Sequence, residues 1–127
     1  EPELTSAEKA VLDSGGGRVV LYHLSGPFSF GAAKGMARCL GALDEFDALV
    51  LDLRDVPFLD SSASLGLEDA ITQAQRHDKN VFLVGVRPDV AETLNRLGVL
   101  KLLPDDHHHV SRLDALKQAV AKIGTAA

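Results

Sequence analysis

The residues best placed for chemistry in this sequence are an aspartate and two serines in succession, Asp60-Ser61-Ser62. Aspartate and serine are preferred at helix N-caps, and the apolar periodicity that follows predicts a helix from here to about His77. Free backbone N–H groups and the positive end of the helix dipole favour an anion at such a position. A phosphate on Ser61 would find donors there and would add about two negative charges beside Asp60, enough to repel a partner. The alternative is that the three residues only cap the helix.

Three aspartates gather around the end of a predicted inner strand, at Asp52, Asp55 and Asp60. Ligands of parallel sheets collect at the carboxyl ends of strands, so this cluster is a candidate binding region. Turn and cap chemistry explains it equally well, because Asp55 opens a turn and Asp60 precedes a helix. No nucleophile and base are paired by their spacing here.

Other catalytic signatures are missing from the sequence. It contains no glycine-rich phosphate loop, no nucleophile elbow and no His-Glu-x-x-His zinc motif. Cys39 falls in the middle of a predicted helix, where a thiol is usually a small hydrophobic residue. In the run His107-His108-His109, His107 and His109 share one face of a strand, but a solvated edge strand explains them better than a metal site does. We therefore expect a non-enzymatic domain with no catalytic residue, cofactor or metal.

Composition bounds the class of protein further. The 127 residues carry 13 Lys and Arg against 18 Asp and Glu, a formal charge of −5, which argues against a nucleic-acid partner. The length fits one domain, residues 1–127. The longest apolar runs, Ala48–Leu51 and Val81–Val86, are too short to cross a bilayer. Because the chain starts at Glu1 without a methionine, we expect a fragment of a larger protein.

Apolar runs alternate with helical patterns at spacings of about 30 residues, which is typical of βαβ units. Strands are predicted over 18–24, 48–53, 81–86 and, at the edge, 107–110. Helices are predicted over 5–12, 32–43, 60–77, 89–97 and 111–123. The sequence thus predicts an α/β fold in which a parallel or mixed sheet of four or five strands packs against four to five helices.

The first predicted helix has its own local signals. Thr5 and Glu8 have the spacing of a capping box, and Gly15-Gly16-Gly17 ends the helix. Its residues Ala7, Ala10 and Val11 can pack on the sheet of the same chain or on that of a second copy. In the second case the chain would exchange this helix in a dimer.

Several separated motifs, in order along residues 8–121, resemble one family. They are Asp60-Ser61-Ser62, Leu24-Ser25-Gly26-Pro27-Phe28-Ser29-Phe30-Gly31-Ala32-Ala33, Val50-Leu51-Asp52-Leu53-Arg54-Asp55-Val56-Pro57-Phe58-Leu59, Leu67-Glu68-Asp69, Val86-Arg87-Pro88 and Leu113-Asp114. Together they resemble the STAS domain, which sulfate transporters share with anti-sigma factor antagonists. In antagonists the position of Ser61 is phosphorylated and a glycine follows the second hydroxyl residue. This sequence has Ala63 in place of that glycine, and its other motifs are more similar to the SulP branch of anion transporters.

The resemblance implies the cytoplasmic C-terminal domain of a carrier at the inner membrane. The carrier would move sulfate, bicarbonate or another small anion through a membrane domain, while this domain helps it to fold, dimerise or gate. Its expected partners are the transmembrane domain of the same polypeptide and a second copy; some relatives bind nucleotides or acyl carrier protein. The alternatives are a stand-alone antagonist switched by phosphorylation at Ser61 and a small-molecule binder that seats an anion there.

Three phenylalanines, Phe28, Phe30 and Phe58, fall in predicted connections near the carboxyl ends of strands. They either fold back as plugs over the end of the sheet or form an apolar contact with the membrane domain or a second copy.

Overall fold

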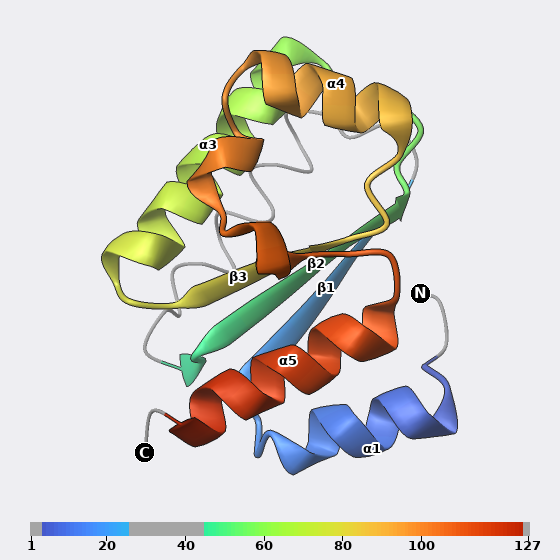
Figure 1. The fold of residues 1–127 in the computed structure, drawn as a ribbon, viewed down its shortest axis with the longest axis vertical. Coiled ribbons are helices and arrows are strands. Elements are labelled where there is room, and N and C mark those ends of the chain that lie inside the picture. Colours follow the sequence, from blue (N-terminus) through green and yellow to red (C-terminus); the bar gives the residue numbers. More distant parts are fainter. Residues whose placement is uncertain (1–3, 26–44, 126–127) are drawn as a thin grey trace.

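A computed structural model describes residues 4–25 and 45–125. All strand pairs are parallel, and the sheet order follows the chain order (Figure 1). The strands are β1 (Val19–Ser25), β2 (Ala48–Asp55), β3 (Asn80–Val84) and β4 (His108–His109). The described helices are α1 (Ser6–Ser14), α3 (Ser61–Arg76), α4 (Pro88–Arg96) and α5 (Arg112–Thr125). The α/β prediction is confirmed; the expected helix over 32–43, with Cys39, and the residues Phe28 and Phe30 lie outside the described residues.

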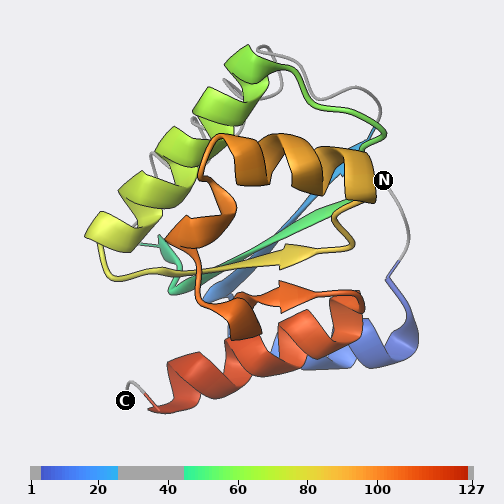
Figure 2. The same ribbon diagram turned by 45° about the horizontal axis from the view of Figure 1, so that its top comes forward.

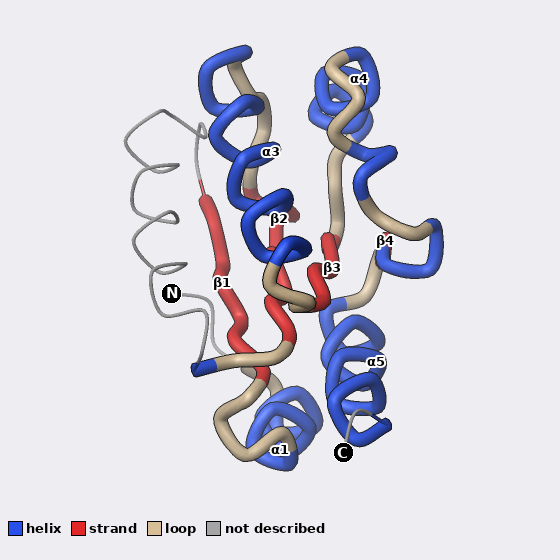
Figure 3. Tube along the Cα trace, turned by 90° about the vertical axis from the view of Figure 1, so that its left-hand side faces the viewer, coloured by secondary structure: helices blue, strands red, loops and turns tan. Residues whose placement is uncertain are grey.

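Helices cover both faces of the sheet. α3 and α4 lie on one face, and α1 and α5 lie on the other (Figures 1 and 2). β2 runs between β1 and β3. Figure 3 shows these strands with α3 and α4 on one side and α1 and α5 on the other. The sequence predicted this covering, because inner strands that are apolar on both faces require it.

The side chains of β2 alternate between two cores. Leu49, Leu51 and Leu53 belong to the larger cluster under α3 and α4, whereas Ala48 and Val50 belong to the cluster under α5. This alternation is the two-residue period of a strand. Asp52 follows the same period and therefore points to the α5 face, where it is completely buried.

Local sequence signals set the bounds of α3 and α4, the helices on the face opposite α5. α3 begins after Asp60 and buries a helical stripe of small and aliphatic residues; α4 has Pro88 at its first turn. The chain turns at Gly98, which has φ 76°, a conformation that glycine adopts readily.

Several predicted strand ends were wrong. The second strand, expected to end at residue 53, continues to Asp55. The third strand stops at Val84 because Gly85 has φ 63°, and a Cβ placed there would lie 2.0 Å from Cγ of Arg54. The edge strand contains two residues rather than four, and His107 belongs to a short 3-10 turn, Asp105–His107.

The expectation of a solvated histidine run was also wrong at its first residue. His107 is 4% exposed, its ring stacks on Phe82 with a centroid separation of 4.3 Å, and its Nδ1 lies 2.9 Å from the carbonyl oxygen of Val81. As a donor to that carbonyl, Nδ1 carries the proton, and Nε2 is buried without a hydrogen-bond partner. Burial therefore lowers the pKa of His107 below its ordinary value of 6.5.

This shift predicts that acid weakens the fold. Because the pKa of His107 is lower in the folded chain, the unfolded chain binds more protons as pH falls below 6.5, and stability is lost through that window. Urea unfolding between pH 7.5 and 5 should show a smaller loss for His107→Leu than for the unsubstituted chain. The exposed His77 is the control, and His77→Leu should keep the original slope. Equal slopes in all three proteins would contradict the assignment.

Candidate functional site

The Asp60-Ser61-Ser62 segment lies where the sequence placed it, at the N-terminus of α3. Asp60 is the N-cap, and its Oδ1 accepts a hydrogen bond from the N–H of Ala63 at 2.6 Å. Ser64 donates its hydroxyl to the carbonyl oxygen of Asp60 at 2.9 Å. The capping role predicted for Asp60 is confirmed, while Ser61 and Ser62 are exposed.

Two large apolar side chains are exposed on either side of these serines in the sequence. Phe58 is 54% exposed in the loop before α3, and Leu65 is 58% exposed one turn into the helix. We call Phe58, Asp60, Ser61, Ser62 and Leu65 the α3 N-terminal surface. Leu65 was missed from the sequence, although the stripe of buried residues in α3 already leaves its position on the opposite side of the helix.

The structure does not bring the three aspartates together as one site. Asp55 pairs with His23 at 2.8 Å, Asp60 caps α3, and Asp52 is buried on the α5 face of the sheet. The cap interpretation describes Asp60, whereas Asp55 is the last residue of β2 and its carboxylate contacts His23 on the neighbouring strand. Asp52 belongs to a different arrangement.

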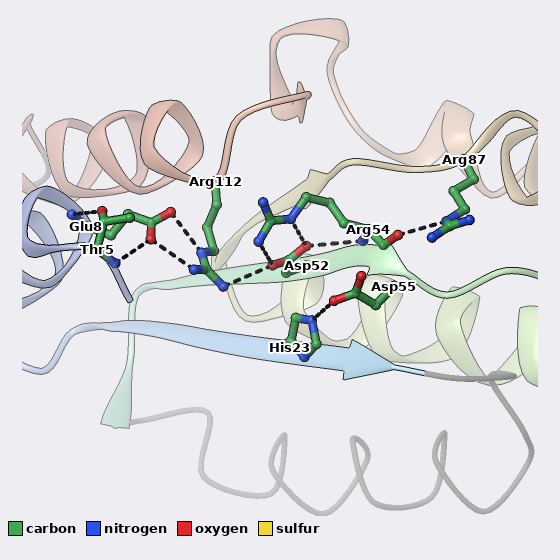
Figure 4. Close-up of polar contacts among 8 residues, drawn as sticks. All are labelled: Thr5, Glu8, His23, Asp52, Arg54, Asp55, Arg87 and Arg112. Atoms are coloured by element: carbon green, nitrogen blue, oxygen red, sulfur yellow. Dashed lines mark hydrogen bonds and ion pairs between the residues drawn. The ribbon is translucent and has the colours of Figure 1, made fainter. Parts of the chain in front are cut away.

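Asp52 is the centre of a buried network of charges (Figure 4). Arg112, at the start of α5, binds both carboxylate oxygens of Glu8 at 2.9 Å and reaches Oδ2 of Asp52 at 3.2 Å. Arg54 approaches Asp52 from the other side, with Nε and Nη2 each 3.2 Å from a carboxylate oxygen. Glu8, Asp52 and Arg112 are all at least nine-tenths buried, and the two acids and two arginines balance in charge.

Hydrogen bonding fixes the ionised forms of Glu8 and Arg112. The guanidinium of Arg112 lowers the pKa of Glu8 from 4.5 to about 2, against the opposing effect of burial. The same contact raises the pKa of Arg112 above its ordinary value. Near neutral pH this pair holds charge rather than transferring protons, so it acts as a structural tie.

The exposed end of this network lies at the carboxyl end of the sheet. The side chain of Arg54 is 43% exposed and lies over Gly85, where no side chain would fit. Arg87, the N-cap residue of α4, donates from Nε to the carbonyl oxygen of Arg54 at 2.8 Å. The carboxyl end of the sheet thus holds two guanidinium groups, those of Arg54 and Arg87.

The histidines do not form a metal centre with other side chains in the described ranges. His107 is packed on Phe82, and Nε2 of His109 contacts Oε1 of Gln118 on α5. Across residues 4–25 and 45–125, no three His, Cys, Asp or Glu side chains are placed to hold a metal ion. An apolar cavity of about 430 Å³ lies between α4 and β4, and none of the residues of the α3 N-terminal surface lines it.

The fold is that of a small α/β domain with a parallel sheet. Polar and charged side chains lie at the carboxyl ends of its strands. The family model for the STAS domain matches residues 14–115. The chain therefore belongs to the STAS domain family, as its motifs indicated. Among the described residues, no helix is both long and apolar enough to cross a membrane.

The chain is similar in sequence to two transporters. It is 43% identical over 121 residues to the bicarbonate transporter BicA of Synechocystis, and 44% identical over 120 residues to BicA of Picosynechococcus. These matches cover 95% and 94% of this chain but only 22% and 21% of the relatives, so the chain spans about a fifth of their length.

Solved structures agree with this fold. The STAS domain of a SulP transporter from Vibrio cholerae superposes with a TM-score of 0.79 at 27% identity, covering 95% of this chain and 99% of that one. The unphosphorylated anti-sigma factor antagonist SpoIIAA gives a TM-score of 0.66 at 13% identity, covering 86% and 90%. At that identity the second likeness shows the fold alone.

The buried network predicts unequal costs for two arginines. Arg112→Met leaves Glu8 buried without a guanidinium and Asp52 with that of Arg54 alone, and should lower the free energy of unfolding by about 3–5 kcal/mol. Arg18 makes a similar two-contact pair with Asp47, but both side chains are 40% exposed, so Arg18→Met should cost about 1 kcal/mol or less. Urea unfolding measures both. Equal losses in the two variants would show that burial does not govern the contribution of these pairs.

Proposed function

We propose that this chain is the STAS domain of a SulP-family anion transporter of the bicarbonate class, and that it regulates the carrier by contact rather than by catalysis. The observation that carries the proposal is the identity of 43% with a bicarbonate transporter across nearly the whole chain. The substrate pathway would lie in a membrane domain of the same polypeptide, and this domain would stand at the cytoplasmic face of the inner membrane. Sulfate is the alternative substrate that the family resemblance leaves open.

The α3 N-terminal surface is the proposed contact region. Phe58 and Leu65 are apolar and more than half exposed. Interfaces with partner proteins bury apolar side chains of this kind at their centres. The membrane domain or a second copy of the chain would cover them. Phe28 and Phe30 remain candidates for the same surface and lie outside the described residues.

The alternative is a stand-alone antagonist that signals through Ser61. Its support is the exposure of Ser61 at the N-terminus of α3, with the carboxylate of Asp60 beside it. A phosphate on Ser61 would repel that carboxylate and change how a partner docks. The two functions differ in what precedes the domain and in whether Ser61 acquires a phosphate.

The DNA upstream of the codon for Glu1 distinguishes them first. We expect it to encode a series of apolar segments of about 20 residues in the same reading frame. Cells that express that full protein should take up labelled bicarbonate, and removal of residues 1–127 should reduce uptake at equal membrane abundance. An initiator codon next to Glu1, together with phosphate on Ser61 in the purified protein, would overturn the carrier function in favour of the antagonist function.

Substitutions test the contact surface in the full protein. Phe58→Ser with Leu65→Ser should lower bicarbonate uptake several-fold, while the unfolding free energy of the isolated domain changes by about 0.5 kcal/mol or less, because both side chains are exposed. Val110 is 89% exposed and lies after β4, so Val110→Ser is the matched control and should keep full uptake. Normal uptake by the double variant would remove this surface from the proposal.

A further inference from the structure

We propose that α1 is a detachable helix, which opens from the domain as one unit about Gly16 and Gly17, and that its docking is coupled to Arg54 through the shared carboxylate of Asp52. The inference concerns this chain alone and does not depend on which anion the full protein carries. It goes beyond a contact role by adding an element that changes position.

The burial of α1 indicates how it is held. Glu8 is its one buried residue, while Val11 and Leu12 are half-buried and Ala7 and Ala10 are exposed. Of the residues expected to pack on the chain's own sheet, Val11 packs against the apolar cluster under α5, whereas Ala7 and Ala10 are exposed where α1 lies against α5; packing on a second copy stays a prediction. A helix with so little buried apolar surface depends for its docking on the ion pair between Glu8 and Arg112.

The helix itself does not need that docking. Its capping box is internal: the N–H of Thr5 donates to Oε1 of Glu8 at 2.9 Å, and the N–H of Glu8 donates to Oγ1 of Thr5 at 3.1 Å. Both bonds survive if α1 leaves the domain as a unit. Opening thus exchanges one buried ion pair and a few apolar contacts for solvent, without requiring the helix to unfold.

The connection to β1 is suited to a hinge. Gly16 and Gly17 have φ values of 61° and 81°, and no atom lies within 4 Å of the position that a Cβ would take on either. Side chains therefore do not hold these two residues, and glycine permits large changes of backbone angle at low cost. Gly15, in contrast, is buried, and a Cβ on it would lie 3.2 Å from Cγ2 of Val19; its carbonyl oxygen accepts a hydrogen bond from the N–H of Arg18 at 3.0 Å, which opening would break.

Coupling to the far end of the network follows from one shared atom. Oδ2 of Asp52 accepts hydrogen bonds from Arg112 and from Arg54, both at 3.2 Å. When Glu8 leaves, the Asp52 carboxylate remains in contact with Arg112 and takes over as its counter-ion. Arg54 is 43% exposed and water can solvate it, so Arg54 is the partner that Asp52 releases.

Residue-resolved hydrogen exchange of the 127-residue chain, followed by NMR, tests the opening. Glu8→Gln keeps an acceptor for the capping box but removes the charge that binds Arg112. We expect amides of α1 to exchange about 10–100-fold faster in this variant, while amides of β2 and β3 report any change in global stability. Asp13→Asn is the matched control on the same helix, because Asp13 is exposed, and it should change α1 exchange less than about twofold.

The side-chain Nε–H of Arg54 donates to the other oxygen of the same carboxylate, Oδ1, so in the same spectra it reports independently whether Arg54 leaves Asp52. It should exchange faster in Glu8→Gln and remain unchanged in Asp13→Asn. If the α1 amides exchange only at the rate of the β2 amides, both in the unsubstituted chain and in Glu8→Gln, the proposal of a detachable helix is overturned. An Arg54 signal that does not respond while α1 opens would overturn the coupling.

Discussion

One completely buried carboxylate, that of Asp52, determines how the α1 and α5 side of the domain is built. A charge removed from water needs strong hydrogen-bonding partners, and here two guanidinium groups supply them. Arg112 comes from α5 and is itself buried, so it brings the same requirement with it. Glu8 meets that requirement and thereby ties the first helix of the chain to the last.

The two faces of the sheet are consequently held by different forces. Under α3 and α4 the packing is apolar and continuous along the leucines of β2, and the buried acids and arginine of the described residues, Glu8, Asp52 and Arg112, lie on the opposite face. Under α1 and α5 the apolar cluster is smaller and the charge network runs beside it. An apolar contact tolerates small shifts of a helix, whereas a two-contact carboxylate–guanidinium pair specifies one position. The apolar face therefore supports the α3 N-terminal surface, and the charged face determines where α1 docks.

Most of the fold could be predicted from the sequence because its signals are local. Strand-sized apolar runs indicate the inner strands, the Thr5–Glu8 spacing indicates the start of α1, and Asp60 indicates the start of α3. The chain's order of strands and helices then leaves few topologies. The exposed surface at α3 could also be found in part, because Phe58 stands in a connection rather than in an element.

The network could not be predicted, because its central contact joins residues 104 positions apart. The capping box already accounted for Glu8, so nothing local indicated a second partner, and Arg112 looked like an ordinary first-turn residue of a helix. Asp52 carried the one available signal: an acid within an otherwise apolar strand implies a buried cation, but the sequence does not say from where. The same limit applies to His107, whose burial depends on Phe82 on another strand.

Stability alone does not explain why this face contains charges. Apolar side chains of similar shape often match or exceed the stability of a buried ion-pair network, so the arrangement is better understood as specifying geometry. A purely apolar α1 could slide or rotate on α5 with little loss, whereas Glu8 can meet both nitrogens of Arg112 in one register only. The helix is thus held in a single position by a contact that is lost as a whole when the acid departs. For the regulation by contact proposed above, this arrangement would give α1 a defined docked state and, once the ion pair is broken, a defined undocked state.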